Sequence, residues 1–89
     1  MLTDEDAIDV VVGCIRAVSG VQTVDTTGSL DDAEISNETR VNNLVDRVVN
    51  SNQIGVPSKG QRIEASQFEN VDSDTIVNAL INIVRNQSA

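Results

Sequence analysis

Few side chains of this sequence could carry out chemistry on their own. The chain has no His, Trp or Tyr, and it has a single cysteine, Cys14. Without His, a general base near neutral pH would have to be a carboxylate, a thiol or a lysine with a shifted pKa. We therefore expect that the protein is not an enzyme, and in particular not an independent hydrolase or oxidoreductase.

The serine hydroxyls that precede an amphipathic segment are the stronger chemical candidates. Ser36 follows a long acidic stretch and directly precedes residues 37–50, where apolar residues recur at helical spacing. Its oxygen could cap a helix by accepting a backbone N–H, which stabilises by roughly 1 kcal/mol. Alternatively, its hydroxyl could be a site of modification, because the helix dipole favours a phosphate there. Ser29 lies earlier in the same stretch and is the weaker candidate for modification, because it is farther from the start of the helix.

Three segments have the periodicity of amphipathic helices and must position these groups. They span residues 3–19, 37–50 and 73–86, and a short helical turn is expected over 65–70. The expected apolar stripes are Ile8, Val11, Val12, Ile15 and Val18, then Val41, Leu44, Val45, Val48 and Val49, then Ile76, Ala79, Leu80, Ile83 and Val84, with Val77 and Ile81 widening the last. The sequence therefore predicts an all-α fold, a small bundle of three main helices plus one short helix, in a single domain over 1–89.

Capping residues predict where these helices begin and end. Gly20 should end the first helix, and Ser36 or Asn37 should cap the second. Asp72 or Ser73 should cap the last helix.

Two long connections, 21–36 and 51–71, should be fixed by scattered apolar anchors. The expected anchors are Val21, Val24, Leu30 and Ile35 in the first connection and Ile54, Val56, Ile63, Phe68 and Val71 in the second. The first connection is acidic but lacks the twelve-residue pattern of a calcium loop, so we expect no metal site.

The charge limits the partners that the protein can have. The net charge is −8, from 14 acidic and 6 basic residues. Nucleic acid and anionic membranes would repel such a surface, whereas a basic protein would be attracted; the charge could also serve solubility alone. There is no 18-residue apolar run and no basic leader, so we expect no membrane insertion and a cytoplasmic location.

The order of elements and several short motifs resemble the acyl carrier protein family. Members often read S-L-x-D-L-G-I-D-S-L-T-R-V at the start of the second helix, and this chain reads S-L-D-D-A-E-I-S-N-E-T-R-V over 29–41, without a gap. Residues 53–57 are similar to the family's extended I-x-I-P segment, and residues 68–76 are similar to its entry to the last helix. The resemblance spans nearly the whole chain. It implies a small acidic helical bundle that carries 4′-phosphopantetheine on a serine.

The family's attachment motif, Asp-Ser-Leu, is altered here. In the gapless comparison its positions hold Ser36, Asn37 and Glu38. Attachment needs a hydroxyl that attacks the pyrophosphate of coenzyme A, and the amide of Asn37 cannot do this. The hydroxyl of Ser36 is displaced by one residue, which in a helix means a rotation of about 100°. The change also removes a carboxylate that helps to hold the transferase's metal ion, and Glu38 puts a charge where partners expect an apolar side chain.

We therefore expect an acyl-carrier-like protein with a degenerate attachment site. Ser36 would bear the arm, whose thiol would carry acyl or aminoacyl groups as thioesters in fatty acid or polyketide biosynthesis. The expected partners of this monomer are a phosphopantetheinyl transferase and biosynthetic enzymes with basic docking surfaces. The alternative is an unmodified interaction module of the same shape, in which Glu38, Asn42 and Asp46 on the exposed side of the second helix contact the partner.

Overall fold

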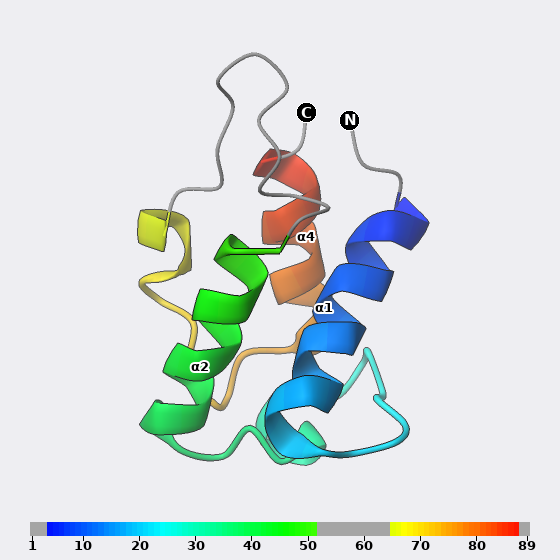
Figure 1. Ribbon diagram of the computed structural model, residues 1–89, viewed down its shortest axis with the longest axis vertical. Helices are drawn as coiled ribbons and strands as arrows, with labels where there is room; N and C mark the ends of the chain where they lie inside the picture. Colours follow the sequence, from blue (N-terminus) through cyan, green and yellow to red (C-terminus); the bar gives the residue numbers. More distant parts are fainter. Residues whose placement is uncertain (1–3, 52–64, 88–89) are drawn as a thin grey trace.

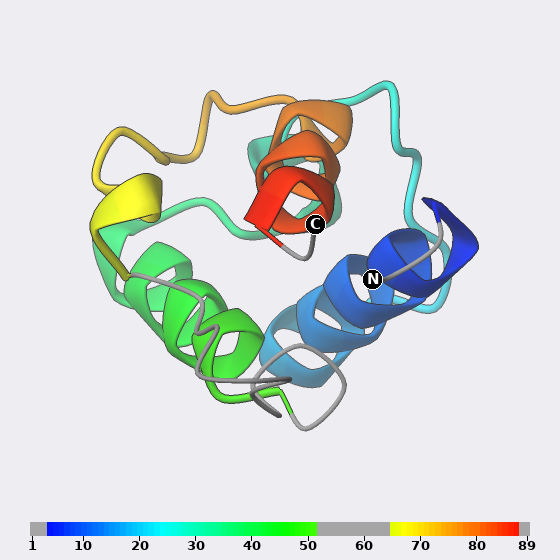
Figure 2. The same cartoon turned by 90° about the horizontal axis from the view of Figure 1, so that it is seen from above.

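The computed structural model describes residues 4–51 and 65–87. The helical elements of this part are α1 (Asp4–Ser19), the 3-10 helix η1 (Asp31–Ala33), α2 (Glu38–Val49), the 3-10 helix η2 (Ala65–Phe68) and α4 (Val77–Gln87). α1 packs against both α2 and α4, and η2 packs against α2 (Figures 1 and 2). The predicted all-α bundle is confirmed, although its short fourth element is a 3-10 turn. Over the described residues, no helix is long and apolar enough to cross a membrane.

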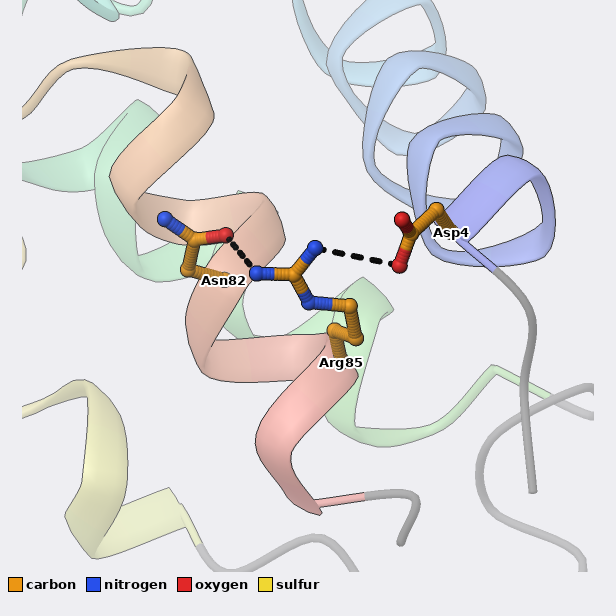
Figure 3. Close-up of polar contacts among 3 residues, drawn as sticks. All are labelled: Asp4, Asn82 and Arg85. Carbon is orange, nitrogen blue, oxygen red and sulfur yellow. Dashed lines mark hydrogen bonds and ion pairs between the residues drawn. The ribbon is translucent and has the colours of Figure 1, made fainter.

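The two ends of the bundle are built differently. α1 runs in the opposite direction to α2 and α4, so the start of α1 and the end of α4 lie at the same end of the molecule (Figure 1). There the Nη1 atom of Arg85 lies 3.0 Å from Oδ1 of Asp4, and its Nη2 atom donates to Oδ1 of Asn82 at 2.6 Å (Figure 3). Because the ion pair is largely exposed, it contributes little to stability. The opposite end holds η1 and the start of α2.

The core is almost entirely aliphatic. Its buried residues are Ala7, Val10, Val11, Ile15, Leu30, Ala33, Ile35, Val41, Leu44, Val48, Phe68, Val77, Leu80, Ile81 and Val84. Phe68, the only aromatic residue of the chain, is one of them. The stripe predicted for α2 is confirmed, because Val41, Leu44 and Val48 are buried and Val45 and Val49 pack against the core.

The stripes predicted for the other two helices were partly wrong in phase. Ile76 precedes α4 and is 43% exposed, and Ala79 is also exposed. The buried face of α4 instead runs through Val77, Leu80, Ile81 and Val84, which is itself a helical repeat. In α1, Ile8 is 39% exposed, whereas Ala7 and Val10 are buried. Both helices are apolar over more than one face, so periodicity alone did not fix which face is buried.

The helix ends confirm two of the three predicted caps. Gly20 ends α1 in the left-handed region, with φ of 79°, and its N–H donates to the Arg16 carbonyl at 2.8 Å. Asn37 caps α2. For α4 the prediction was wrong: the helix begins at Val77 rather than at residue 73. Oδ1 of Asp72 closes a local turn instead, by accepting the Asp74 N–H at 2.9 Å.

Backbone carbonyl groups of the first connection accept the first N–H groups of α4. The N–H groups of Val77 and Asn78 donate to the carbonyls of Gly28 and Thr26, at 2.9 and 3.0 Å. In the other direction, the Leu30 N–H donates to the Thr75 carbonyl at 2.8 Å. Backbone carbonyls from a distant segment thus cap the helix, and the connection is fastened to α4 in return.

Most of the predicted anchors hold these connections in place. Leu30 and Ile35 are fully buried, and Val21, Val24 and Val71 pack against the core. The predicted anchors Ile54, Val56 and Ile63, and the motif at residues 53–57, lie outside the described residues.

Candidate functional site

The segment that leads into α2 begins with a closed pair of hydrogen bonds. The Ser29 hydroxyl accepts the N–H of Asp32 at 3.2 Å, and the Asp32 carboxylate accepts the N–H of Ser29 at 3.1 Å. This reciprocal arrangement is that of a capping box, and here it starts η1. The Ser29 hydroxyl is therefore engaged in the fold, which agrees with its lower rank as a candidate.

η1 ends in a turn that requires an unusual backbone conformation. Glu34 has φ of 66° and ψ of 23°, in the left-handed region. Its N–H donates to the Asp31 carbonyl at 2.9 Å, and the Ile35 N–H donates to the Leu30 carbonyl at 2.9 Å. This pair of bonds is a Schellman closure, whose left-handed position is usually glycine because other residues pay roughly 1–2 kcal/mol there. In the gapless comparison with the carrier pattern, that position is the pattern's Gly.

Asn37, and not Ser36, caps α2. Asn37 is extended, with φ of −138° and ψ of 166°, and its Oδ1 atom accepts the backbone N–H of Arg40 at 2.9 Å. Its carbonyl accepts the first intrahelical bond, from Val41, at 3.0 Å. The interpretation of Ser36 as the N-cap was therefore wrong. Ser36 lies one residue before the cap, and its hydroxyl accepts none of the N–H groups of the first turn.

The Ser36 side chain is consequently left unused by the fold. Ser36 is exposed, and its hydroxyl makes no hydrogen bond within the described part of the chain. It sits directly before the cap, at the positive end of the α2 dipole. Its neighbour Glu38, also exposed, occupies the first turn of the helix.

Arg40 joins the two sides of this junction. Its Nη1 atom donates to the carbonyl oxygen of Glu34 at 2.7 Å, while its backbone N–H is held by Asn37. Ser36 lies between these two points of attachment in the sequence. Neither Arg40 nor Glu34 is among the site residues predicted from the sequence, although the Gly of the carrier pattern opposite Glu34 is a signal of a left-handed turn.

The predicted partner-binding residues are exposed, but they do not all meet. Asn42 and Asp46 line a groove of about 450 Å³ between α2 on one side and the end of η2 with the residues after it on the other. Glu38 does not line this groove. The other residues along the groove are Val41, Val45, Phe68, Glu69 and Val71. The exposed side chains of the groove are mostly acidic and amide groups, because Val41 and Phe68 are almost fully buried beneath it.

Cys14 lies in a second hollow, between α1 and the end of α2. It is half-buried and packs against the core, as expected of a small core residue. Burial raises the pKa of its thiol, and the nearby Arg47 guanidinium offsets this in part. The thiol is thus mainly protonated at neutral pH and a poor nucleophile.

Two acidic side chains of the first connection, those of Asp25 and Asp32, close local turns. The Asp25 carboxylate accepts the hydroxyl and the N–H of Thr27, at 2.7 and 2.9 Å, and these bonds lower its pKa. Asp32 is engaged by Ser29. In the part of the chain that the structure describes, no three His, Cys, Asp or Glu side chains come together as a metal site would require.

Comparisons with known proteins give no assignment. No family model, no curated protein and no solved structure matches the chain.

Proposed function

We propose that the protein is an acyl-carrier-like protein whose attachment residue is Ser36. The observation that carries the proposal is the exposed Ser36 hydroxyl: Asn37 provides the cap, and the serine oxygen has no hydrogen-bond partner over residues 4–51 and 65–87. The left-handed turn at Glu34 adds support, because the carrier pattern has Gly at that position. Ser36 precedes the helix, so a transferase would meet its hydroxyl on the connection before the Asn37 cap rather than on the first turn.

The chemistry of attachment is a single displacement at phosphorus. The Ser36 oxygen attacks the pantetheine-bearing phosphorus of coenzyme A, a new P–O bond forms, and the pyrophosphate P–O bond breaks. Adenosine 3′,5′-bisphosphate leaves, and the hydroxyl proton passes to a base of the transferase. The attached arm ends in a thiol that carries acyl or aminoacyl groups as thioesters, and the protein itself catalyses nothing. We place this chemistry in the cytoplasm, with fatty acid or polyketide biosynthesis as the setting.

Co-expression with a broad-specificity phosphopantetheinyl transferase tests the proposal. The intact protein should gain the mass of one phosphopantetheine group, and Ser36→Ala should abolish the gain. Ser29→Ala is the matched control, since it removes a hydroxyl from the same connection and should leave the gain unchanged. No gain with any transferase, or a gain that persists in Ser36→Ala, would contradict attachment at Ser36.

An unmodified interaction module is the second candidate, and it would use the groove beside α2. Two of the three predicted contact residues, Asn42 and Asp46, line this groove together with Glu69. An amphipathic segment could place apolar side chains against the partly exposed Val45 and Val71 and basic ones against the two carboxylates. The partner enzymes of a carrier would need similar basic groups, so the groove fits either function.

A model peptide separates this candidate from simple charge attraction. An amphipathic helix of Leu and Lys should shift the NMR signals of Val45 and Val71, and Asp46→Lys should weaken the effect. The same peptide with its residues shuffled, so that charge is kept and amphipathicity is lost, is the control. Equal shifts from both peptides would show that the groove has no selective role.

A further inference from the structure

We infer that Arg40 is the positioning residue of the Ser36 site: its guanidinium holds the strained turn at Glu34 closed and thereby fixes how Ser36 is presented. The inference builds on the proposed attachment at Ser36, but the clamp itself is defined by contacts within the chain. The 2.7 Å bond from Arg40 Nη1 to the Glu34 carbonyl is its central contact.

The turn at Glu34 needs such a contact. A residue with a Cβ atom in the left-handed region is destabilised relative to glycine, and it persists only where its surroundings compensate. Two backbone bonds close the turn, from Glu34 to Asp31 and from Ile35 to Leu30. The Arg40 guanidinium adds a charge-assisted bond to the one residue in the strained conformation.

The clamp spans Ser36 from both sides. On the earlier side, Arg40 holds the Glu34 carbonyl, and next to it the Ile35 side chain is fully buried. On the later side, Asn37 is fixed because its side chain accepts the Arg40 N–H. One residue of α2 therefore fixes the backbone before and after the serine, while the serine side chain is left exposed. Arg40 does not take part in the bond-forming step, and its effect passes through the backbone that carries Ser36.

Hydrogen exchange provides the direct test. In Arg40→Gln, the amides of Glu34 and Ile35 should exchange about 5-fold faster, which corresponds to the net contribution of one ordinary hydrogen bond. The amides in the middle of α1 and α4 should keep their wild-type rates. Arg47→Gln, which removes the same charge from a later turn of the same helix, is the matched control and should leave both turn amides unchanged.

Relief of the strain should make Arg40 less necessary. Because glycine adopts the left-handed conformation without penalty and keeps the carbonyl that Arg40 binds, Glu34→Gly should offset part of the faster exchange that Arg40→Gln causes at Ile35. Arg40→Lys keeps the charge and one donor, so it should retain part of the protection. Unchanged exchange of the Glu34 and Ile35 amides in Arg40→Gln would overturn the inference, as would an equal acceleration of the same amides in Arg47→Gln.

Attachment kinetics then connect the clamp to Ser36. With a transferase that modifies the wild type, Arg40→Gln should lower kcat several-fold and leave KM nearly unchanged, and Arg40→Lys should restore part of the rate. Attachment rates equal to those of Arg47→Gln would overturn a positioning role. If the wild-type chain accepts no arm, the attachment proposal fails, and the exchange experiment alone then decides whether Arg40 holds the turn.

Discussion

Ser29 and Ser36 lie in the same connection between α1 and α2, and the fold uses them in opposite ways. The hydroxyl of Ser29 starts η1 through a reciprocal pair of bonds with Asp32. The hydroxyl of Ser36 has no partner within the described residues, although its backbone lies between two fixed neighbours. The comparison shows that the hydroxyl of a serine near a helix start is bonded into a turn at one place and exposed at another, depending on which neighbour takes the cap.

The largest loss of stability should come from replacing Leu30, the buried residue that anchors the connection holding both serines. Leu30 is fully buried, and its backbone bonds to both Thr75 and Ile35. Leu30→Ala should lower the free energy of unfolding by about 3 kcal/mol, because it leaves a cavity in a small core. Urea denaturation measures the change. A loss below about 1 kcal/mol would mean that the connection is not anchored as the structure shows.

The cap of α2 offers the sharpest contrast within the Ser36 region. Asn37→Ala should cost about 1 kcal/mol, because the Arg40 N–H loses its side-chain acceptor. Ser36→Ala should change stability by less than about 0.5 kcal/mol, as expected at an exposed site without partners. The two variants can be compared by thermal unfolding. The reverse order would make Ser36 the cap and remove the basis of its assignment.

A smaller loss of stability is expected when Ser29 is replaced. Ser29→Ala removes one of two exposed reciprocal bonds and should cost about 0.5–1 kcal/mol. The amide of Asp32 should then exchange faster, because it loses its acceptor. A Ser29→Ala variant as stable as Ser36→Ala, with unchanged exchange at Asp32, would erase the contrast between the two residues.

The smallest effect concerns Cys14, which lies outside both regions. Since burial raises the pKa of its thiol, the folded state disfavours the thiolate. The resulting stability is present below the ordinary thiol pKa and is lost as pH rises through the raised value. Unfolding measured between neutral and alkaline pH should therefore show a decline that Cys14→Ala lacks. The same decline in Cys14→Ala would assign it to other groups.

The sequence predicted the bundle better than it predicted the site. The 3.6-residue repeat of α2 identified its buried face, because its opposite face is polar throughout. The start of α4 was missed because its first N–H groups bond to the carbonyls of Thr26 and Gly28, which are distant in the sequence. No local pattern reports a cap of that kind.

The choice between Ser36 and Asn37 was open for a different reason. Both residues are good N-caps, so propensity does not separate them. The structure decides because Glu34 and Ile35 fix where the chain enters the helix, and that entry places Asn37 at the cap. The bond from Arg40 to the Glu34 carbonyl could not be predicted, because a charged residue on an exposed helical face rarely indicates such a contact.

The most direct test of the account is to locate the modification on the purified chain. The protein is incubated with coenzyme A and a broad-specificity transferase, and fragmentation mass spectrometry identifies the residue that carries the added group. The account predicts one phosphopantetheine group, on Ser36, with Ser29 unmodified. An arm on any other residue, or none under conditions that load a known carrier protein, would contradict it.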